Sequence, residues 1–211
     1  MPFVDREIEM SALEAAYKNP IASLFVVYGR RRVGKTTLLA EFCKGKHALY
    51  YLATEESIQA NCAAFREMAA DFLQDELLRS AANAGWEMIF KTLLAQPSEE
   101  KLVIIIDEFQ YLGKADKAFP SVFQKIWDTQ LKNENVEVIL CGSLVHMMME
   151  QTLSYSSPLY GRRTGQIKLK QIPYAYYNQF FPAMSEQERI LYYAVTGGVP
   201  KYIELFHQGK E

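Results

Sequence analysis

Tyr28 to Thr37 reads Y-G-R-R-R-V-G-K-T-T and joins an apolar run, Leu24 to Tyr28, to a segment of good helix formers, Lys35 to Phe42. Between Gly29 and Thr36 it matches the pattern G-x-x-x-x-G-K-[ST], in which glycines let backbone N–H groups turn toward phosphate oxygens. The helix that follows would present its positive end to the same phosphates. The stretch therefore predicts a strand, a phosphate-binding loop and a helix, the unit from which α/β proteins are built.

Each fixed position of this loop has a task in holding a nucleoside triphosphate. Lys35 is expected to reach the β and γ oxygens, and to face solvent when no nucleotide is bound, while Thr36 is expected to ligate Mg²⁺. The predicted nucleotide-binding residues of this stretch are Gly29, Arg30, Arg31, Arg32, Val33, Gly34, Lys35, Thr36 and Thr37.

The three consecutive arginines, Arg30 to Arg32, exceed what a phosphate loop needs. The loop backbone and Lys35 suffice to bind phosphate, and three adjacent side chains cannot all converge on one ligand. The arginines would raise the positive potential at the mouth of the site, and they could pair with Glu55, Glu56, a neighbouring subunit or nucleic acid. The sequence leaves their purpose open.

A second chemical motif ends the run L-V-I-I-I-D, Leu102 to Asp107. Its unbroken aliphatic character is typical of a central strand in a parallel sheet. Asp107 at the tip of that strand could hold Mg²⁺, and Glu108 could orient and deprotonate the attacking water. The alternative is an acidic pair that merely ends a strand at the surface.

The rest of the chain alternates strands with helices, which predicts a doubly wound parallel sheet with ligands at the carboxyl ends of its strands. The further strands expected are Ala48 to Ala53, Val136 to Cys141 and Gly165 to Leu169. The helices expected are Glu7 to Tyr17, a long helix capped by Ser57, Ala84 to Ala95, and one with Pro120 in its first turn.

From Pro173 the sequence changes to aromatic helices, predicted at Tyr174 to Phe181, at Ser185 to Thr196 behind the capping box S-E-Q-E, and from Pro200. We therefore expect a core of residues 1–172 and a helical appendage of residues 173–211. The chain ends without an obvious terminating structure, so we expect a fragment that lacks a further domain.

The composition of the chain argues against several kinds of binding partner. The 211 residues carry a formal net charge of −2, which argues against binding nucleic acid over the whole surface. Cys43, Cys62 and Cys141 lack the spacing of a zinc site and are interpreted as small buried hydrophobes in a reducing compartment. The amino terminus has no signal-like segment and no stretch approaches the roughly 18 apolar residues of a membrane span, so we expect a cytoplasmic protein without a membrane partner.

The sequence also bears on which nucleotide is bound and on which reaction follows. A guanine-specific protein would carry D-x-x-G after the third strand, whereas this chain has D-E-F-Q at Asp107 to Gln110. A small-molecule kinase would share the phosphate loop but would not usually need an Asp-Glu pair to activate water. These two observations disfavour GTP and favour hydrolysis.

Five segments occur in one order along the chain: F-V-D-R-E, Y-G-R-R-R-V-G-K-T-T, L-V-I-I-I-D-E-F-Q-Y-L, S-P-L-Y-G-R-R and T-G-G-V-P-K-Y. Together they resemble the archaeal-type ATPase family, which is placed with the signal-transduction ATPases with numerous domains (STAND) and is related to the AAA+ ATPases. The resemblance implies a P-loop NTPase fold with a five-stranded sheet in the order 5-1-4-3-2. It also implies ATP or ADP as the ligand and a helical lid.

The resemblance also assigns roles to residues. It places Phe3, Val4 and Arg6 near the adenine, although the segment could simply open a capped helix. It makes Ser143 the polar sensor of the γ-phosphate or the water, a role compatible with capping a helix. Pro200, in the stretch G-V-P, would close the lid over the base, or it could only start the next helix.

Arg162 and Arg163 occupy the place just before the last strand where relatives carry an arginine finger. The alternative is a pair of solvated basic residues. Nothing in the sequence says whether either arginine would act within its own chain or in a self-associated form.

The leading hypothesis is a switch driven by ATP binding and slow hydrolysis, in which the lid reports the nucleotide state to an effector domain that would contact DNA or protein. One alternative is an AAA+-like ring ATPase acting on DNA. Another is a nucleotide-binding interaction module with little turnover, such as a toxin–antitoxin or defence component.

Overall fold

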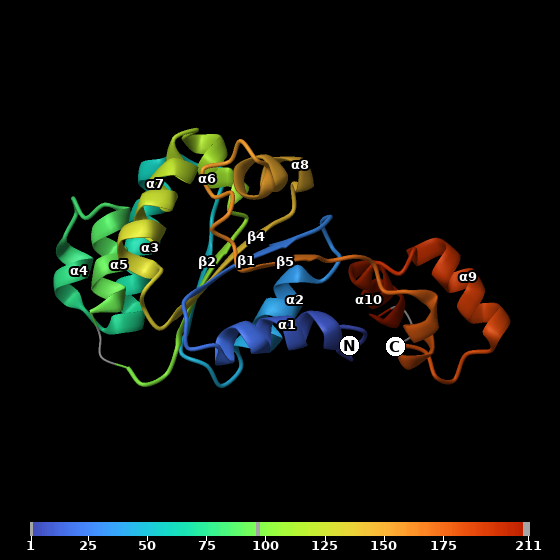
Figure 1. Cartoon of the computed structure of the whole chain (residues 1–211). Helices are drawn as coiled ribbons and strands as arrows, with labels where there is room; N and C mark the ends of the chain where they lie inside the picture. The colour runs from blue at the N-terminus through green and yellow to red at the C-terminus, as the bar shows by residue number, and fades with distance from the viewer. Residues whose placement is uncertain (1, 96–97, 209–211) are drawn as a thin grey trace.

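A sheet of five parallel strands forms the centre of the molecule, in a computed structural model that describes residues 2–95 and 98–208 (Figure 1). The strands are β1 (Ser23–Tyr28), β2 (Ala48–Leu52), β3 (Leu102–Asp107), β4 (Val136–Gly142) and β5 (Gly165–Lys168). Their order is β2-β3-β4-β1-β5, with every neighbouring pair parallel. Read from the other edge this is 5-1-4-3-2, so the predicted fold and strand order are confirmed.

The three inner strands β1, β3 and β4 are buried along their whole length. Helices cover both faces of a parallel sheet, so its central strands need apolar side chains on both sides, which explains the unbroken aliphatic run of β3. The predicted strand at residues 165–169 ends one residue earlier, at Lys168.

Helices form a layer on each face of this sheet (Figure 1). On one face, α1 (Glu7–Lys18) and α2 (Lys35–Cys43) pack on strand residues such as Phe25 and Ile105. The elements that contribute to the larger cluster on the other face are α3 (Ile58–Leu73), α4 (Glu76–Ser80), α5 (Trp86–Leu94), α6 (Gln110–Ala115), α7 (Phe119–Ile126), the π-helix η1 (Trp127–Leu131) and α8 (Val145–Met148). A second π-helix, η2 (Met149–Leu153), continues α8. Ser57 caps α3 as predicted, its hydroxyl accepting from the Ala60 N–H at 3.1 Å.

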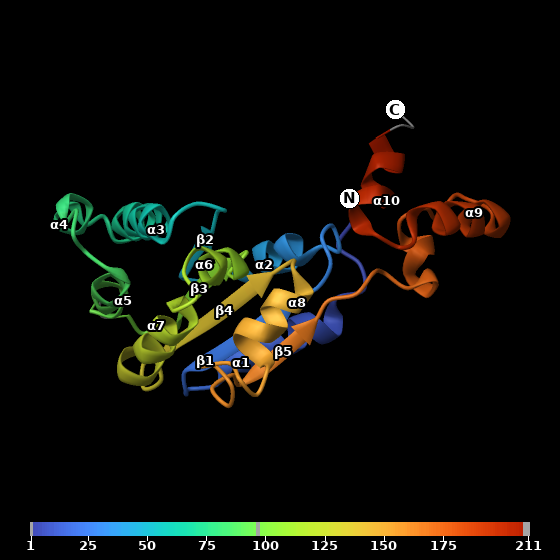
Figure 2. The same cartoon turned by 90° about the horizontal axis from the view of Figure 1, so that it is seen from above.

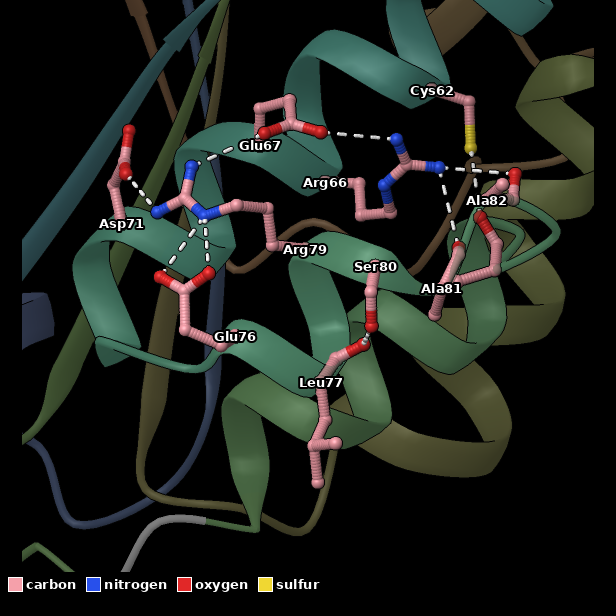
Figure 3. A network of polar contacts seen from close by, with 11 residues as sticks. Cys62, Arg66, Glu67, Asp71, Glu76, Leu77, Arg79, Ser80, Ala81 and Ala82 are labelled. Carbon is pink, nitrogen blue, oxygen red and sulfur yellow. Dashed lines mark hydrogen bonds and ion pairs between the residues drawn. The ribbon is translucent and has the colours of Figure 1, made fainter.

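The short helix α4 is joined to α3 by a network of ion pairs (Figure 3). The Arg79 guanidinium contacts Glu67 at 3.2 Å, Glu76 at 3.2 Å and Asp71. Hydrogen bonds to Asp71 and Glu76 raise the pKa of Arg79 above its usual value. Because these groups lie at the surface, the network contributes little to the stability of the whole fold.

The helical appendage has a hydrophobic cluster of its own and lies beyond the end of the sheet rather than on either face (Figure 2). It consists of the 3₁₀-helix η3 (Tyr174–Gln179), α9 (Glu186–Thr196) and α10 (Pro200–Gln208). The helix predicted at residues 174–181 is thus a shorter 3₁₀-helix, whereas the capping box at Ser185 is present. Residues 209–211 of the predicted appendage lie outside the described residues.

The cysteines are free thiols; Cys141 is buried, and Cys43 and Cys62 are partly buried. Burial raises the pKa of all three thiols, which disfavours the reactive thiolate. Of the helices formed by residues 2–95 and 98–208, none combines the length and apolarity needed to cross a bilayer.

Candidate active site

A cavity of about 710 Å³ opens where the carboxyl ends of the central strands meet the phosphate loop. The predicted site residues that line it are Arg31, Arg32, Gly34, Lys35, Thr36, Thr37, Glu108, Ser143 and Pro200. Segments separated by more than 160 residues in the chain therefore meet around one cavity, at the edge of the sheet where ligands bind in open α/β folds.

Two glycines allow the loop its shape. A Cβ on Gly29 would lie 2.4 Å from the carbonyl oxygen of Leu169, so only glycine permits the loop to pass this close to the segment after β5. Gly34 has φ +94°, in the left-handed region, and directly precedes α2. The loop can therefore direct the first N–H groups of α2 toward a bound anion.

Lys35 is buried rather than exposed to solvent, so that expectation was wrong. Its ammonium donates to the carbonyl oxygens of Gly29 at 3.0 Å and Arg30 at 3.1 Å. A buried charge must find polar partners, and two carbonyls of the loop supply them here. These two bonds hold the Lys35 ammonium against the backbone of the loop.

The Asp107 carboxylate is held by donors from three parts of the fold. Its Oδ1 accepts from the Glu108 N–H at 2.8 Å, and its Oδ2 accepts from the Thr36 hydroxyl at 3.4 Å and the Tyr50 hydroxyl at 2.5 Å. Thr36 and Asp107 therefore lie together, as the magnesium hypothesis requires. A carboxylate and a hydroxyl beside a phosphate loop fit the preference of Mg²⁺ for oxygen ligands.

Tyr50 was not predicted as a site residue, because nothing in the sequence shows that it reaches Asp107. Burial, followed by the charge of Asp107, raises the pKa of Tyr50 above its usual value. The tyrosine therefore stays protonated and acts as a donor. Only the pairing of β2 with β3 could have indicated the contact.

Glu108 has φ +53°, a strained conformation for a residue other than glycine and one that is concentrated at functional sites. Its Oε2 accepts from the hydroxyl of Ser143 at 2.7 Å and the N–H of Ser143 at 3.2 Å. The side-chain amide of Gln110, which the sequence did not single out, donates to the same oxygen. One carboxylate oxygen is thus anchored while the side chain lines the cavity. This arrangement suits a base that accepts a proton from water in a fixed orientation.

Two of the three arginines of the loop bind tyrosines. Arg31 donates to the Tyr111 hydroxyl at 2.8 Å, and Arg32 donates to the Tyr202 hydroxyl at 3.1 Å and lies 5.5 Å from the centre of that ring. Since Tyr111 belongs to α6 and Tyr202 to α10, the two arginines connect the loop to both elements.

The glutamates offered as partners have other contacts. Glu55 forms an ion pair with Lys114 of α6, and Glu56 accepts from the Thr54 hydroxyl at 3.3 Å. Arg30 contributes its carbonyl oxygen to Lys35. Among the described residues, therefore, Arg31 and Arg32 bind Tyr111 and Tyr202, and Glu55 and Glu56, two of the partners that the sequence left open, are not the ones they contact.

A small cavity of about 40 Å³ adjoins the loop on the side of the helical appendage. Its lining includes Phe3, Val4, Arg6, Phe180 and Pro200. The amino-terminal segment and the G-V-P stretch, predicted from the resemblance to flank the adenine, thus lie side by side.

Arg6 is hydrogen-bonded to the backbone of the phosphate loop. Its guanidinium donates to the carbonyl oxygens of Val33 at 3.1 Å and Lys170 at 2.9 Å. Burial lowers the pKa of Arg6, and nearby Glu9, at 3.6 Å, opposes that effect. One nitrogen of the guanidinium thus binds the backbone and another faces Asp5 and Glu9, while the side chain still borders the small cavity.

Arg162 and Arg163 precede β5, which is parallel to β1, so they lie at the amino end of the strands, whereas the phosphate loop follows the carboxyl end of β1. Arg162 pairs with Asp128 at 2.7 Å and thereby lowers the pKa of that carboxyl, while Arg163 donates to the carbonyl of Leu153 at 3.2 Å. Neither lines the nucleotide cavity. An arginine finger acting within one chain does not fit this placement, and action across an interface stays a prediction.

The sheet order, the phosphate loop before α2 and the acidic pair after β3 define a P-loop protein of the ATPase class. A family of ATPase domains found predominantly in Archaea matches residues 3–206. The chain belongs to that family.

A longer protein is similar in sequence to nearly the whole of this chain. The uncharacterized protein MJECL04 of Methanocaldococcus jannaschii is 38% identical over 202 residues, which cover 96% of this chain and 43% of that protein. The chain therefore spans less than half the length of that relative.

Two solved structures share the fold. The Walker-type ATPase PABY2304 of Pyrococcus abyssi superposes with a TM-score of 0.64 at 22% identity, over 95% of this chain and 65% of that one. The STAND protein PH0952 of Pyrococcus horikoshii, which has a tetratricopeptide repeat sensor, gives 0.60 at 20% identity, over 94% and 28%. At these identities the likeness concerns the fold.

Proposed function

We propose that this chain binds ATP with Mg²⁺, hydrolyses it slowly and serves as a nucleotide-dependent switch. The observation that carries the proposal is that Thr36 and Glu108 line one cavity beside the phosphate loop, and that the Thr36 hydroxyl contacts Asp107 at 3.4 Å. Charge-binding, metal-holding and proton-accepting groups are the parts that phosphoryl transfer to water requires.

Each residue has a distinct role in this mechanism. Lys35 would exchange its bonds to loop carbonyls for bonds to phosphate oxygens, and the N–H groups at the start of α2 would bind the remaining phosphate charge. Thr36 and Asp107 would hold Mg²⁺, which neutralises charge on the transferred phosphoryl group when bound. Glu108, anchored by Ser143, would orient water and accept its proton.

The lid contacts support a switch. Pro200 lies 3.6 Å from the position that a Cβ on Gly34 would take, and Tyr202 binds Arg32 of the same loop. A lid responds to nucleotide only if its contacts differ between two states. We propose that bound phosphate draws Arg32 away from Tyr202 and so changes how α10 is held.

The output of this switch would lie outside the chain. The matched relative is more than twice as long, and one protein of similar fold is a STAND protein with a repeat sensor. We propose that a further domain of the natural protein receives the change in the lid, and that its target is DNA or another protein. Self-association would let Arg162 or Arg163 act on a neighbouring site.

The test is Glu108→Gln, which keeps the shape and the hydrogen bonds of the side chain but cannot accept a proton. We expect ATP affinity to stay near that of the unaltered chain while phosphate release slows by a factor on the order of 10²–10⁴. Glu150→Gln, at an exposed glutamate of η2, provides the matched control.

Calorimetry would give the affinity and single-turnover phosphate release would give the rate. Unchanged release from Glu108→Gln would remove Glu108 as the base. If the unaltered chain binds ATP but releases no phosphate, the nucleotide-binding module without turnover becomes the better description.

A further inference from the structure

Tyr50 contacts the candidate metal site from the neighbouring strand. In the pairing of β2 with β3, Leu52 lies opposite Asp107 and Tyr50 lies opposite Ile105. On β2, Tyr50 is therefore two residues before the position opposite Asp107. Its side chain runs forward along the sheet, and its hydroxyl reaches Asp107 Oδ2 at 2.5 Å. The ring packs in the layer under α1 and α2, which holds the hydroxyl in place.

The Thr36 hydroxyl and the Glu108 N–H, which also donate to Asp107, cannot hold Oδ2 in place in the same way. The Thr36 hydroxyl is at 3.4 Å and is itself the group expected to turn toward a metal. The Glu108 N–H binds the other oxygen, Oδ1, at 2.8 Å. Once Thr36 turns away, Tyr50 is the hydroxyl among the described residues that still binds Oδ2, and the buried thiol of Cys141, a weaker donor, also interacts with the carboxylate.

We propose that Tyr50 is a positioning residue for the metal-holding carboxylate: its hydroxyl fixes the rotation of Asp107 so that the carboxylate faces Mg²⁺ bound with ATP. The inference rests on the proposed function, since it presumes a metal at Thr36 and Asp107. Partners that orient a ligand in this way typically contribute 10–100-fold to metal affinity.

The neighbouring residue offers a matched control. Tyr51 precedes Leu52 on the same strand but points to the other face, where its hydroxyl donates to the Asn61 side chain at 2.8 Å. Tyr50→Phe and Tyr51→Phe each remove one hydroxyl from adjacent positions, the first with its bond to Asp107 and the second with its bonds to the side chain and the carbonyl oxygen of Asn61. Only the first change touches Asp107.

The measurement is Mn²⁺ affinity in the presence of saturating ATP, by electron paramagnetic resonance, with ATP affinity in EDTA measured by calorimetry. Tyr50→Phe should weaken Mn²⁺ binding by about 10–100-fold and leave metal-free ATP binding unchanged. Tyr51→Phe should leave both unchanged. Unaltered Mn²⁺ affinity in Tyr50→Phe, or an equal loss in Tyr51→Phe, would overturn the proposal.

A double-mutant cycle keeps the test decisive if Tyr50→Phe lowers stability. In the Asp107→Asn background, adding Tyr50→Phe should produce no further loss of Mn²⁺ affinity, because the residue acts through that carboxylate. A full additional loss would show that Tyr50 acts by another route. Failure of the proposed function would look different, since the unaltered chain would then bind neither ATP nor Mn²⁺ with ATP.

Discussion

Replacing Glu137 with Gln should remove a pH dependence from the stability of the fold. Glu137 lies inside β4, fully buried, beside Ser23 of β1 and Val103 of β3. Within the described part of the chain neither of its carboxyl oxygens has a hydrogen-bond partner. An ionised carboxylate at this position would be costly, so the folded state favours the protonated acid.

The size of the effect follows from the pKa of Glu137, which burial raises from 4.5 to about 8. Lys101 and Lys46 act in the opposite direction, and Glu14 of α1 adds to the rise. Because the folded state holds the proton more tightly, the stabilisation is complete below about pH 4.5 and is lost as the pH rises to about 8. At about 1.4 kcal/mol per pH unit, the loss over that interval is roughly 5 kcal/mol.

Urea unfolding between pH 5 and pH 9 would measure it. A Gln amide resembles the neutral acid and does not ionise, so Glu137→Gln should match the unaltered chain near pH 5 and exceed it increasingly toward pH 8. Glu134→Gln, at an exposed glutamate just before the same strand, should follow the unaltered chain throughout. A constant difference between Glu137→Gln and the unaltered chain at every pH would refute the reasoning.

Three further predictions concern the site and the core. Pro200→Ala should weaken ATP and ADP binding by roughly 1–2 kcal/mol without affecting inorganic triphosphate; calorimetry showing equal losses for ATP and triphosphate would mean that the lid does not contact the base. Ser143→Ala should slow single-turnover hydrolysis roughly tenfold through the loss of one bond to Glu108 while ATP affinity holds, and an unchanged rate would argue against anchoring. Phe65→Ala, at a fully buried ring, should lower the free energy of urea unfolding by about 3–5 kcal/mol, and a loss below about 1 kcal/mol would show that Phe65 does not anchor the core.

The sequence predicted the parts of the fold that local chemistry determines. The β3 run is aliphatic because it is covered on both faces, and the capping box at Ser185 satisfies the first N–H groups of α9 without help from the rest of the fold. The strand order followed from the resemblance, since hydrophobic periodicity says nothing of which strands are neighbours. The short helices α4 and α6 were missed because five or six residues carry too little periodic signal.

The site residues also divide into those that the local sequence predicts and those that depend on the packing of distant elements. Asp107 and Glu108 could be placed because the first ends a buried strand and the second directly follows it. The contacts of Tyr50, Gln110 and Arg32 could not, because each depends on how distant elements pack. Lys35 was misjudged for a related reason: the sequence identified its ligand but not the carbonyls that satisfy its charge without one.

The most direct test of an ATP site at the phosphate loop is calorimetric titration of ATP with Mg²⁺ into the unaltered chain and into Lys35→Ala, with circular dichroism of both. Removing a charged donor should weaken binding by at least about 1.5–3 kcal/mol, while the spectrum stays that of the α/β fold. Equal affinity of the two proteins for ATP would contradict the account.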